Sequence, residues 1–288
     1  MRLHLVDGTF ELFRAHYAPR PERDHKATVG LVLSMLGLLG EQAEAVTHIA
    51  IAFDNPIRSF RNQWFAGYKS DQGVDPVLRA QFDDAEEAAR ALGLVVWSMD
   101  RFECDDALAT AVARWKGSVE QVRILSPDKD FGQCLDGGRV VLVDRIRRRE
   151  TDQAAYFAKF GLHPPSVPDY LALVGDTADG IPGLPGIGAK SASALLSAYG
   201  HLEAIPDDPS RWRVKLRGAD RIAEVLRTRR EEALLYRRLA TLVTDVPLAE
   251  SLDDLAFRGV PRERALAWAA RMKVDLASEL ARVRMKSP

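Results

Sequence analysis

Residues 3–8 read Leu-His-Leu-Val-Asp-Gly, a short apolar run that ends in an aspartate and a glycine. Apolar runs of this kind are typical of strands that are buried on both faces of a parallel sheet. Four more runs follow in the first half of the chain: His48–Phe53, Leu94–Trp97, Val122–Leu125 and Val140–Val143. We therefore expect five strands, with the first one ending at Asp7.

The segments between these runs have helical periodicity. Ala27–Leu39 is apolar nearly all round, which predicts a buried helix, and apolar residues recur every three to four positions from Leu78 to Leu92 and from Leu108 to Trp115. Strands that alternate with helices indicate βαβ units. The sequence predicts an α/β fold with a mostly parallel central sheet flanked by helices.

The pattern changes at residues 162–168, Leu-His-Pro-Pro-Ser-Val-Pro, where three prolines predict a linker or turn. Beyond this stretch β-type runs nearly vanish and helical periods dominate. We expect two domains: an α/β domain over residues 1–165 and a smaller all-helical domain over residues 166–288.

Composition excludes several classes of protein. Two cysteines, Cys104 and Cys134, are too few for a disulfide framework or a zinc cluster, which favours a reducing, cytoplasmic setting. The longest apolar run, Leu31–Leu39, is about half the ~20 residues that a membrane span needs. The formal net charge of −1 does not by itself suggest a nucleic-acid partner.

Carboxylates follow three of the predicted strands: Asp7, Asp54 and Asp128. Ligands of open parallel sheets bind at the carboxyl ends of the strands, so these side chains can converge on one crevice. Each aspartate can equally cap the helix or turn that follows it. The pattern leaves both interpretations open.

Two denser clusters favour a metal site. Glu103-Cys104-Asp105-Asp106 begins a predicted helix, and Asp128-Lys129-Asp130 follows a strand. Crowded carboxylates repel one another unless cations lie among them, and oxygen ligands suit magnesium or manganese better than zinc. Glu103 and Asp106 share a helix face only if the helix includes Glu103, so part of this cluster need not touch an ion.

A third acidic pair, Asp176 and Asp179, has the i, i+3 spacing of one helical turn and precedes a glycine-rich stretch, Gly183–Lys190. A tight turn before a helix leaves N-terminal amides free to bind phosphate, and Lys190 adds positive charge. The alternative is a plain helix–turn–helix loop. Next to an acidic pair, the stretch suggests a clamp on a nucleic-acid backbone.

Taken together, these motifs resemble the 5′-nuclease family, which comprises the 5′→3′ exonuclease domain of bacterial DNA polymerase I and the flap endonucleases. The resemblance extends from Leu3 to about Leu248. The segments that carry it are Val6-Asp7-Gly8, Leu12-Phe13-Arg14-Ala15, Phe53-Asp54, Ser59-Phe60-Arg61, Gly67-Tyr68-Lys69, Phe102–Asp106, Ile124–Phe131 and Gly175–Lys190. It implies a PIN-like α/β domain and a helical domain with a helix-hairpin-helix-type DNA-binding element.

The resemblance implies that nine carboxylates hold two Mg²⁺ or Mn²⁺ ions. The set around the first ion is Asp7, Asp54, Glu103, Asp105, Asp106 and Asp128, and the set around the second is Asp130, Asp176 and Asp179. Asp128 would serve between the two ions as a catalytic residue. The helical domain would thus contribute Asp176 and Asp179 to the metal site.

The same resemblance assigns the contacts to substrate. Lys69, with Arg61, would neutralise charge on the phosphate, and Tyr68 would contact DNA. The hairpin residues Gly183, Gly186, Gly188 and Lys190 would grip the duplex, with K⁺ bound at the turn. Residues 68–84 match a short arch. Gln72 stands where relatives have an arginine, and Arg58 or Arg79 can substitute for it.

The implied activity is that of a divalent-metal-dependent, structure-specific 5′ nuclease that acts in replication or repair. It would be a flap endonuclease and 5′→3′ exonuclease on DNA with 5′ flaps, nicks or 5′ ends. We expect a stand-alone, monomeric, cytoplasmic enzyme without a membrane partner. Two alternatives remain: a branched-DNA-binding protein with a weak or vestigial nuclease site, and an RNA-directed PIN-like nuclease.

The acidic clusters also change the meaning of the net charge. The nine carboxylates account for more than the whole charge of −1, so the rest of the chain is net positive. Residues 211–238 hold ten Lys and Arg against four acids, and Arg145–Arg149 forms a second basic run. Such runs are usually solvated faces, but these can meet duplex phosphates.

Overall fold

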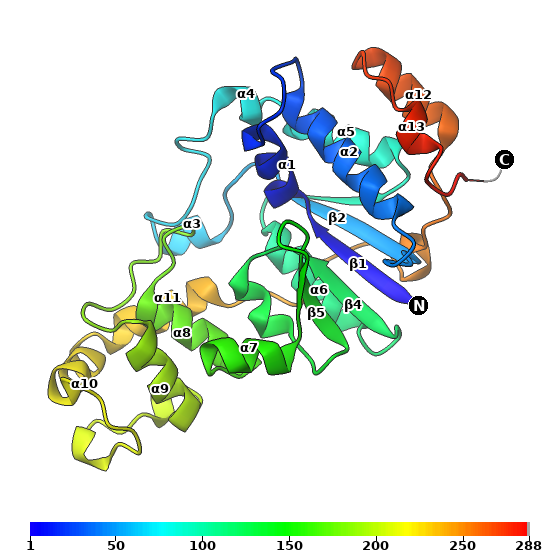
Figure 1. Ribbon diagram of the computed structural model, residues 1–288. Coiled ribbons are helices and arrows are strands. Elements are labelled where there is room, and N and C mark those ends of the chain that lie inside the picture. The colour runs from blue at the N-terminus through cyan, green and yellow to red at the C-terminus, as the bar shows by residue number, and fades with distance from the viewer. Residues whose placement is uncertain (287–288) are drawn as a thin grey trace. The chain divides into compact units, whose positions relative to one another are not determined.

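The computed structural model (Figure 1) describes residues 1–286. The chain divides into two compact units. The first unit contains Met1–Ser59, Asp71–Ser126 and the chain from Thr244 onward, and the second contains Phe60–Ser70 and Pro127–Val243. This division differs from the predicted one, which placed a single boundary between residues 165 and 166. The last two residues of the predicted second domain, 287–288, lie outside the described range.

Four parallel strands form the sheet of the first unit, in the order β3-β2-β1-β4. Their bounds are β1 Arg2–Asp7, β2 His48–Asp54, β3 Val95–Met99 and β4 Gln121–Leu125. Leu5 of β1 lies opposite Ala50 of β2 and Ile124 of β4. The predicted parallel sheet is confirmed. Every residue of β2 is buried, as expected for a central strand with helices on both faces.

Helices cover this sheet on both faces. The helices of the first unit are α1 Gly8–Tyr17, α2 Lys26–Gly40, α4 Pro76–Arg79, α5 Phe82–Ala91, α6 Cys104–Trp115, α12 Arg262–Arg271 and α13 Ala277–Leu280, with a 3₁₀ turn at Asp253–Leu255. Helix α2 packs against α1 and α5, while α6 packs on β1, β2 and β3 (Figure 1). The nearly all-apolar α2 is buried over most of its length, as predicted.

The C-terminal part of the chain belongs to the first unit. Helix α12 packs against α5, and α13 packs against α2. The predicted helical domain over residues 166–288 therefore does not correspond to one compact unit. The last helices bury Trp268 and Leu280 against the first unit, a packing relation that helical periodicity alone does not reveal.

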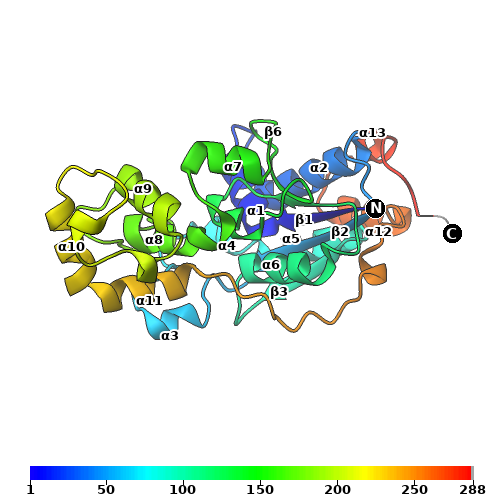
Figure 2. The same ribbon diagram turned by 90° about the horizontal axis from the view of Figure 1, so that it is seen from below.

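The second unit is mainly helical. Its elements are α3 Arg61–Trp64, η1 Lys129–Cys134, β5 Val140–Asp144, β6 Arg149–Thr151, α7 Gln153–Phe160, η2 Pro164–Ser166, α8 Val167–Val174, α9 Ala189–Tyr199, η3 Leu202–Ala204, η4 Pro209–Arg211, α10 Ala219–Thr228 and α11 Arg230–Ala240. Strands β5 and β6 pair antiparallel. Helix α8 lies between α9 and α11 and packs on both (Figure 2).

The three prolines near residue 165 begin helical turns instead of forming an extended linker. Pro164 lies in the first turn of η2, and Pro168 lies in the first turn of α8. Proline suits these positions because it has no amide hydrogen to leave unpaired and its φ is already helical. Leu162 and Val167 are completely buried, so this stretch is part of the core of the second unit.

Candidate metal centre and nucleic-acid interface

Asp7 and Asp54 lie at the ends of adjacent strands in the first unit. One oxygen of Asp7 accepts a hydrogen bond from the amide of Phe10 at 2.8 Å and so caps α1, while the other accepts from Ser126 Oγ at 2.9 Å. Asp54 Oδ1 accepts from the amide of Cys104 at 2.6 Å. Both carboxylates are less than 10% exposed. Of the two interpretations that the sequence left open, the capping of a following helix is observed at Asp7.

The acidic cluster at the start of α6 forms a capping box. Glu103 is the N-cap residue, and its amide donates to Asp106 Oδ2 at 3.1 Å. Glu103 Oε1 accepts from Ser59 Oγ at 2.6 Å. Asp106 has no exposed surface, whereas Asp105 is partly exposed. Asp106 thus holds Glu103 in place, and Asp105 is the member of this cluster with the most exposed side chain.

The second unit brings together four more carboxylates, from two segments. Asp128 caps η1 by accepting from the amide of Asp130 at 2.8 Å. Asp176 Oδ1 accepts from the amides of Ala178 at 2.9 Å and Asp179 at 3.4 Å. Paired backbone hydrogen bonds between Asp176 and Ile181, both 2.8 Å, close the loop that carries Asp176 and Asp179. This loop holds both aspartates without a regular helix.

Lys129 links these two segments. Its ammonium donates a short hydrogen bond to Asp176 Oδ2 and lies 3.3 Å from Asp130 Oδ1. Asp130 is 6% exposed, and its Oδ1 accepts no hydrogen bond. A buried carboxylate oxygen without a donor is costly, so a cation is the natural partner for this atom. The donor set fits a hard divalent ion, and the Lys129 ammonium is the cation that this structure places beside it.

The pKa values of this cluster reflect the crowding. Burial raises the pKa of Asp130, and the charges of Asp128, Asp179 and Asp176 raise it further, against the effect of Lys129. Burial also raises the pKa of Asp176, but the hydrogen bond and charge of Lys129 lower it below its ordinary value. Among residues 1–286, no three His, Cys, Asp or Glu side chains are already grouped as a metal site.

Lys69 and Tyr68 both contact Asp179. Lys69 Nζ lies 3.2 Å from Asp179 Oδ1, and the Tyr68 hydroxyl donates to Asp179 Oδ2 at 3.3 Å. Tyr68 is 4% exposed, so its ring has no free face for an unpaired base. The proposed DNA contact by Tyr68 therefore does not fit the structure, and its hydroxyl instead positions Asp179.

Arg61 does not fit the phosphate-binding role proposed for it. Its side chain is 1% exposed, Nε donates to the carbonyl of Leu239 at 2.8 Å, and one terminal nitrogen donates to the carbonyl of Thr241 at 2.8 Å. These carbonyls lie at the C-terminal end of α11, where cations complement the helix dipole. The phosphate role was predicted because a motif does not show whether its arginine is buried or exposed.

The glycine-rich stretch forms a tight connection between α8 and α9. Gly183 has φ +71°, and a Cβ there would lie 2.5 Å from the amide nitrogen of Gly175, so only glycine fits. Gly188 is the N-cap of α9 and makes no side-chain cap, and Lys190 in the first turn is exposed. The Arg221 guanidinium lies beside Gly186. The free amides and two cations make this turn a candidate anion site.

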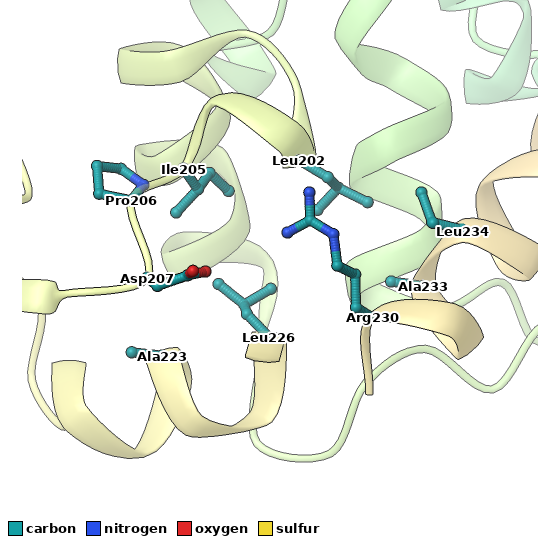
Figure 3. Close-up of a pocket in the computed structure, with 9 residues that line it drawn as sticks. All are labelled: Leu202, Ile205, Pro206, Asp207, Ala223, Leu226, Arg230, Ala233 and Leu234. Carbon is teal, nitrogen blue, oxygen red and sulfur yellow. The ribbon is translucent and has the colours of Figure 1, made fainter. Parts of the chain in front are cut away.

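A pocket in the second unit lies elsewhere, among η3, α10 and α11 (Figure 3). Its lining is Leu202, Ile205, Pro206, Asp207, Ala223, Leu226, Arg230, Ala233 and Leu234. Apolar side chains form most of the wall, and Asp207 and Arg230 supply its charged groups. None of the predicted site residues lines it, so we do not assign it to the candidate centre.

Sequence reasoning missed two residues that shape the site. Lys129 stands between two aspartates, a pattern that could have marked it as a built-in counter-ion. Gly180 has φ +73°, and a Cβ there would lie 2.1 Å from the carbonyl oxygen of Gly67. The positive φ and the close approach of the Gly67 carbonyl together favour glycine at this position.

Two family models match the chain. One is described as the 5′-3′ exonuclease N-terminal resolvase-like domain and matches residues 2–161, and the other is the 5′-3′ exonuclease C-terminal SAM fold, which matches residues 162–263. DNA polymerase I of Mycobacterium leprae is 34% identical over 274 residues, which are 91% of this chain and 29% of that protein. The chain thus spans under a third of the length of this relative.

Solved structures share the fold at lower identity. A T5 5′-exonuclease with divalent zinc ions bound has a TM-score of 0.66 at 18% identity and covers 95% of this chain and 98% of its own. A bacteriophage T5 D15 flap endonuclease in a complex with DNA and metal ions has a TM-score of 0.65 at 20% identity, covering 83% and 89%.

The fold is that of the T5 5′-exonuclease structures, and the two family models class the chain as a nuclease. The chain belongs to the 5′-3′ exonuclease family, whose two domain models together match residues 2–263. Nucleases of this family depend on metal ions, as the sequence predicted. Among residues 1–286, we find no helix that is long and apolar enough to span a membrane.

Proposed function

We propose that this chain hydrolyses phosphodiester bonds of DNA at 5′ flaps, nicks and 5′ ends with two Mg²⁺ or Mn²⁺ ions. One observation carries the proposal: the second unit buries the unbonded Oδ1 of Asp130 among further carboxylates and neutralises the cluster with lysines. A purely structural cluster would instead satisfy each oxygen with amides and hydroxyls. An exchangeable cation explains the arrangement better.

The proposed ligands form two sets. Asp7, Asp54, Glu103, Asp105 and Asp128 are assigned to one ion, and Asp106 supports Glu103. Asp130, Asp176 and Asp179 are assigned to the other. When bound, two such ions activate a water molecule and stabilise the departing oxygen. Lys69 is assigned to the phosphate, because its ammonium is partly exposed beside Asp179.

The proposed DNA interface uses the connection between α8 and α9. The free amides at the start of α9 and Lys190 would contact phosphates of the uncleaved duplex, and K⁺ would bind at the turn formed by Gly183, Gly186 and Gly188. The ten basic residues between positions 211 and 238 add to this interface. The likeness to a flap endonuclease described in complex with DNA supports this assignment. By the resemblance to the 5′-nuclease family, we also propose that the protein is a monomeric, cytoplasmic enzyme.

The test is cleavage of a 5′-flap DNA by wild-type protein and by Asp128→Ala over a magnesium titration. We expect the variant to lose at least about 100-fold in rate at every magnesium concentration while it still binds the flap DNA. Asp152→Ala is the matched control, because Asp152 caps α7 in the same unit and belongs to no acidic cluster. Full cleavage by Asp128→Ala would contradict the assignment, and DNA binding without cleavage by wild type would favour the branched-DNA-binding alternative.

A further inference from the structure

Lys129 occupies the position between two carboxylates that come from distant parts of the chain. Its ammonium bonds to Asp176 Oδ2 and lies 3.3 Å from Asp130 Oδ1. Asp130 and Asp176 are 6% and 8% exposed, so the two carboxylates that face the ammonium are largely desolvated. The Lys129 ammonium is a compact positive charge that neutralises the two carboxylates, as a metal ion would.

The backbone of Lys129 is fixed, although its side chain is not enclosed. The Tyr156 hydroxyl donates to the carbonyl of Lys129 at 3.0 Å, and Gly132 lies against the ring of Tyr156, where a Cβ would approach to 2.4 Å. The Lys129 side chain is nevertheless 39% exposed. A four-carbon side chain on a fixed backbone can therefore swing into solvent without unfolding the site.

The charges around this position favour a positive group. Burial alone would lower the pKa of Lys129, but the charges of Asp130, Asp176 and Asp128 raise it above its ordinary value. Two lysines, Lys129 and Lys69, face four aspartates in this part of the second unit. The cluster therefore keeps a net negative charge and can still attract a divalent ion.

We propose that Lys129 is a built-in competitor of the divalent ion at the site of Asp130 and Asp176. In the metal-free protein its ammonium holds the two carboxylates together, and when the ion binds, the ammonium leaves for solvent. This inference rests on the proposed function, because it takes the second acidic set to be a metal site. It makes Lys129 a positioning residue that sets how much free metal the site needs.

The proposal has two opposite consequences for one substitution. Lys129→Met keeps an unbranched side chain of similar length, one atom shorter, and removes its charge. The metal-free protein should become less stable, because the buried carboxylates lose their counter-ion. The divalent ion should bind more tightly, because it no longer displaces an ammonium. A lysine with only a structural role would lower stability and leave metal affinity unchanged or weaker.

The experiment is a calorimetric titration of Mn²⁺ into chelator-treated protein without DNA, paired with thermal unfolding in chelator and in Mn²⁺. For Lys129→Met we expect about tenfold tighter Mn²⁺ binding, a lower Tm in chelator and a larger rise of Tm on adding Mn²⁺. Lys159→Met is the control, because Lys159 is exposed on α7 and its ammonium lies over the ring of Phe160. It should bind Mn²⁺ as wild type does.

Each outcome decides between the two proposals. Mn²⁺ uptake by wild type with unchanged or weaker affinity in Lys129→Met overturns the role of Lys129 and leaves the proposed function standing. No Mn²⁺ uptake by wild type overturns both. If Lys129→Met fails to fold, Lys129→Gln replaces it, since its amide can still donate to Asp176 without a full charge; tighter Mn²⁺ binding supports the proposal, and unchanged binding overturns it.

Discussion

Lys69 and Asp179 are joined twice: the amide of Lys69 donates to the carbonyl oxygen of Asp179 at 3.0 Å, and the ammonium lies 3.2 Å from Oδ1. The segment before residue 70 is thereby attached to the loop that carries the second acidic pair. The Lys69 ammonium, which is assigned to the phosphate, and the Asp179 carboxylate, which is assigned to a metal ion, are thus held next to each other.

Replacing Lys69 tests its assigned role in the reaction. We expect Lys69→Ala to lower the rate of cleavage of a 5′-flap DNA about 100-fold, because the charge that develops on the phosphate loses a partner. Affinity for the same DNA should change much less. Single-turnover rates at saturating protein measure this, with Lys159→Ala as the control. Partial rescue by Lys69→Arg would support a charge role, and an unchanged rate in Lys69→Ala would exclude it.

Gly180 tests the contact between the two segments. We expect Gly180→Ala to destabilise the protein by about 2 kcal/mol or more, because strain at φ +73° is added to a Cβ that would lie 2.1 Å from the Gly67 carbonyl oxygen. The matched control is Gly161→Ala, which has φ +67° but nothing within 4 Å of the added Cβ. Gly161→Ala should lower the free energy of unfolding by only about 1 kcal/mol. Equal losses in urea unfolding would show that the close contact is unimportant.

Arg61 is expected to act on stability and not on chemistry. Arg61→Met should lower the free energy of unfolding by about 3 kcal/mol, because the carbonyls of Leu239 and Thr241 lose charged donors in a buried position. The rate of cleavage per folded molecule, measured well below the Tm, should stay within about threefold of wild type. A large loss of rate at unchanged stability would restore the phosphate role that the sequence suggested.

Glu44 gives the first unit a predictable response to acid. The hydrogen bond with His4 lowers the pKa of Glu44 to about 2, against the opposing effect of burial and with help from Arg123. Because this pKa is depressed in the folded state, the stabilisation is present above pH 4.5 and is lost as the pH falls toward 2. Glu44→Gln should therefore lose about 2 kcal/mol at pH 6 and show a flatter decline of stability between pH 5 and 3. Parallel stability–pH curves for both proteins would contradict this.

Sequence patterns predicted the strands and the acidic positions well because both follow local rules. Buried parallel strands are short apolar runs, and their carboxyl ends carry Asp7 and Asp54 as expected. Relations that depend on tertiary packing were not predictable in this way. Nothing in the local sequence shows that Arg61 caps a helix 178 residues away, that Tyr68 is buried, or that α12 packs on α5.

The candidate site was predictable as a set of residues but not as a set of contacts. The nine carboxylates were assigned from the resemblance to the 5′-nuclease family and stay a prediction, whereas the part of Lys129 in holding Asp176 required coordinates. Proline runs were also ambiguous, because Pro164 and Pro168 begin helical turns in a buried stretch that local rules treat as a linker. Residues that a resemblance groups together can thus have catalytic, positioning or packing roles that only the fold distinguishes.

The most direct test of the central claim is product mapping on matched DNA substrates that carry a 5′ flap, a nick or a blunt end. The wild-type protein should cut in Mg²⁺ near the flap junction and release short products from the nick, and chelator should abolish both activities. Asp130→Asn, which keeps the shape of a proposed ligand, should cut at least about 100-fold more slowly. Cleavage that persists in chelator, or that does not depend on the 5′ structure, would contradict the account.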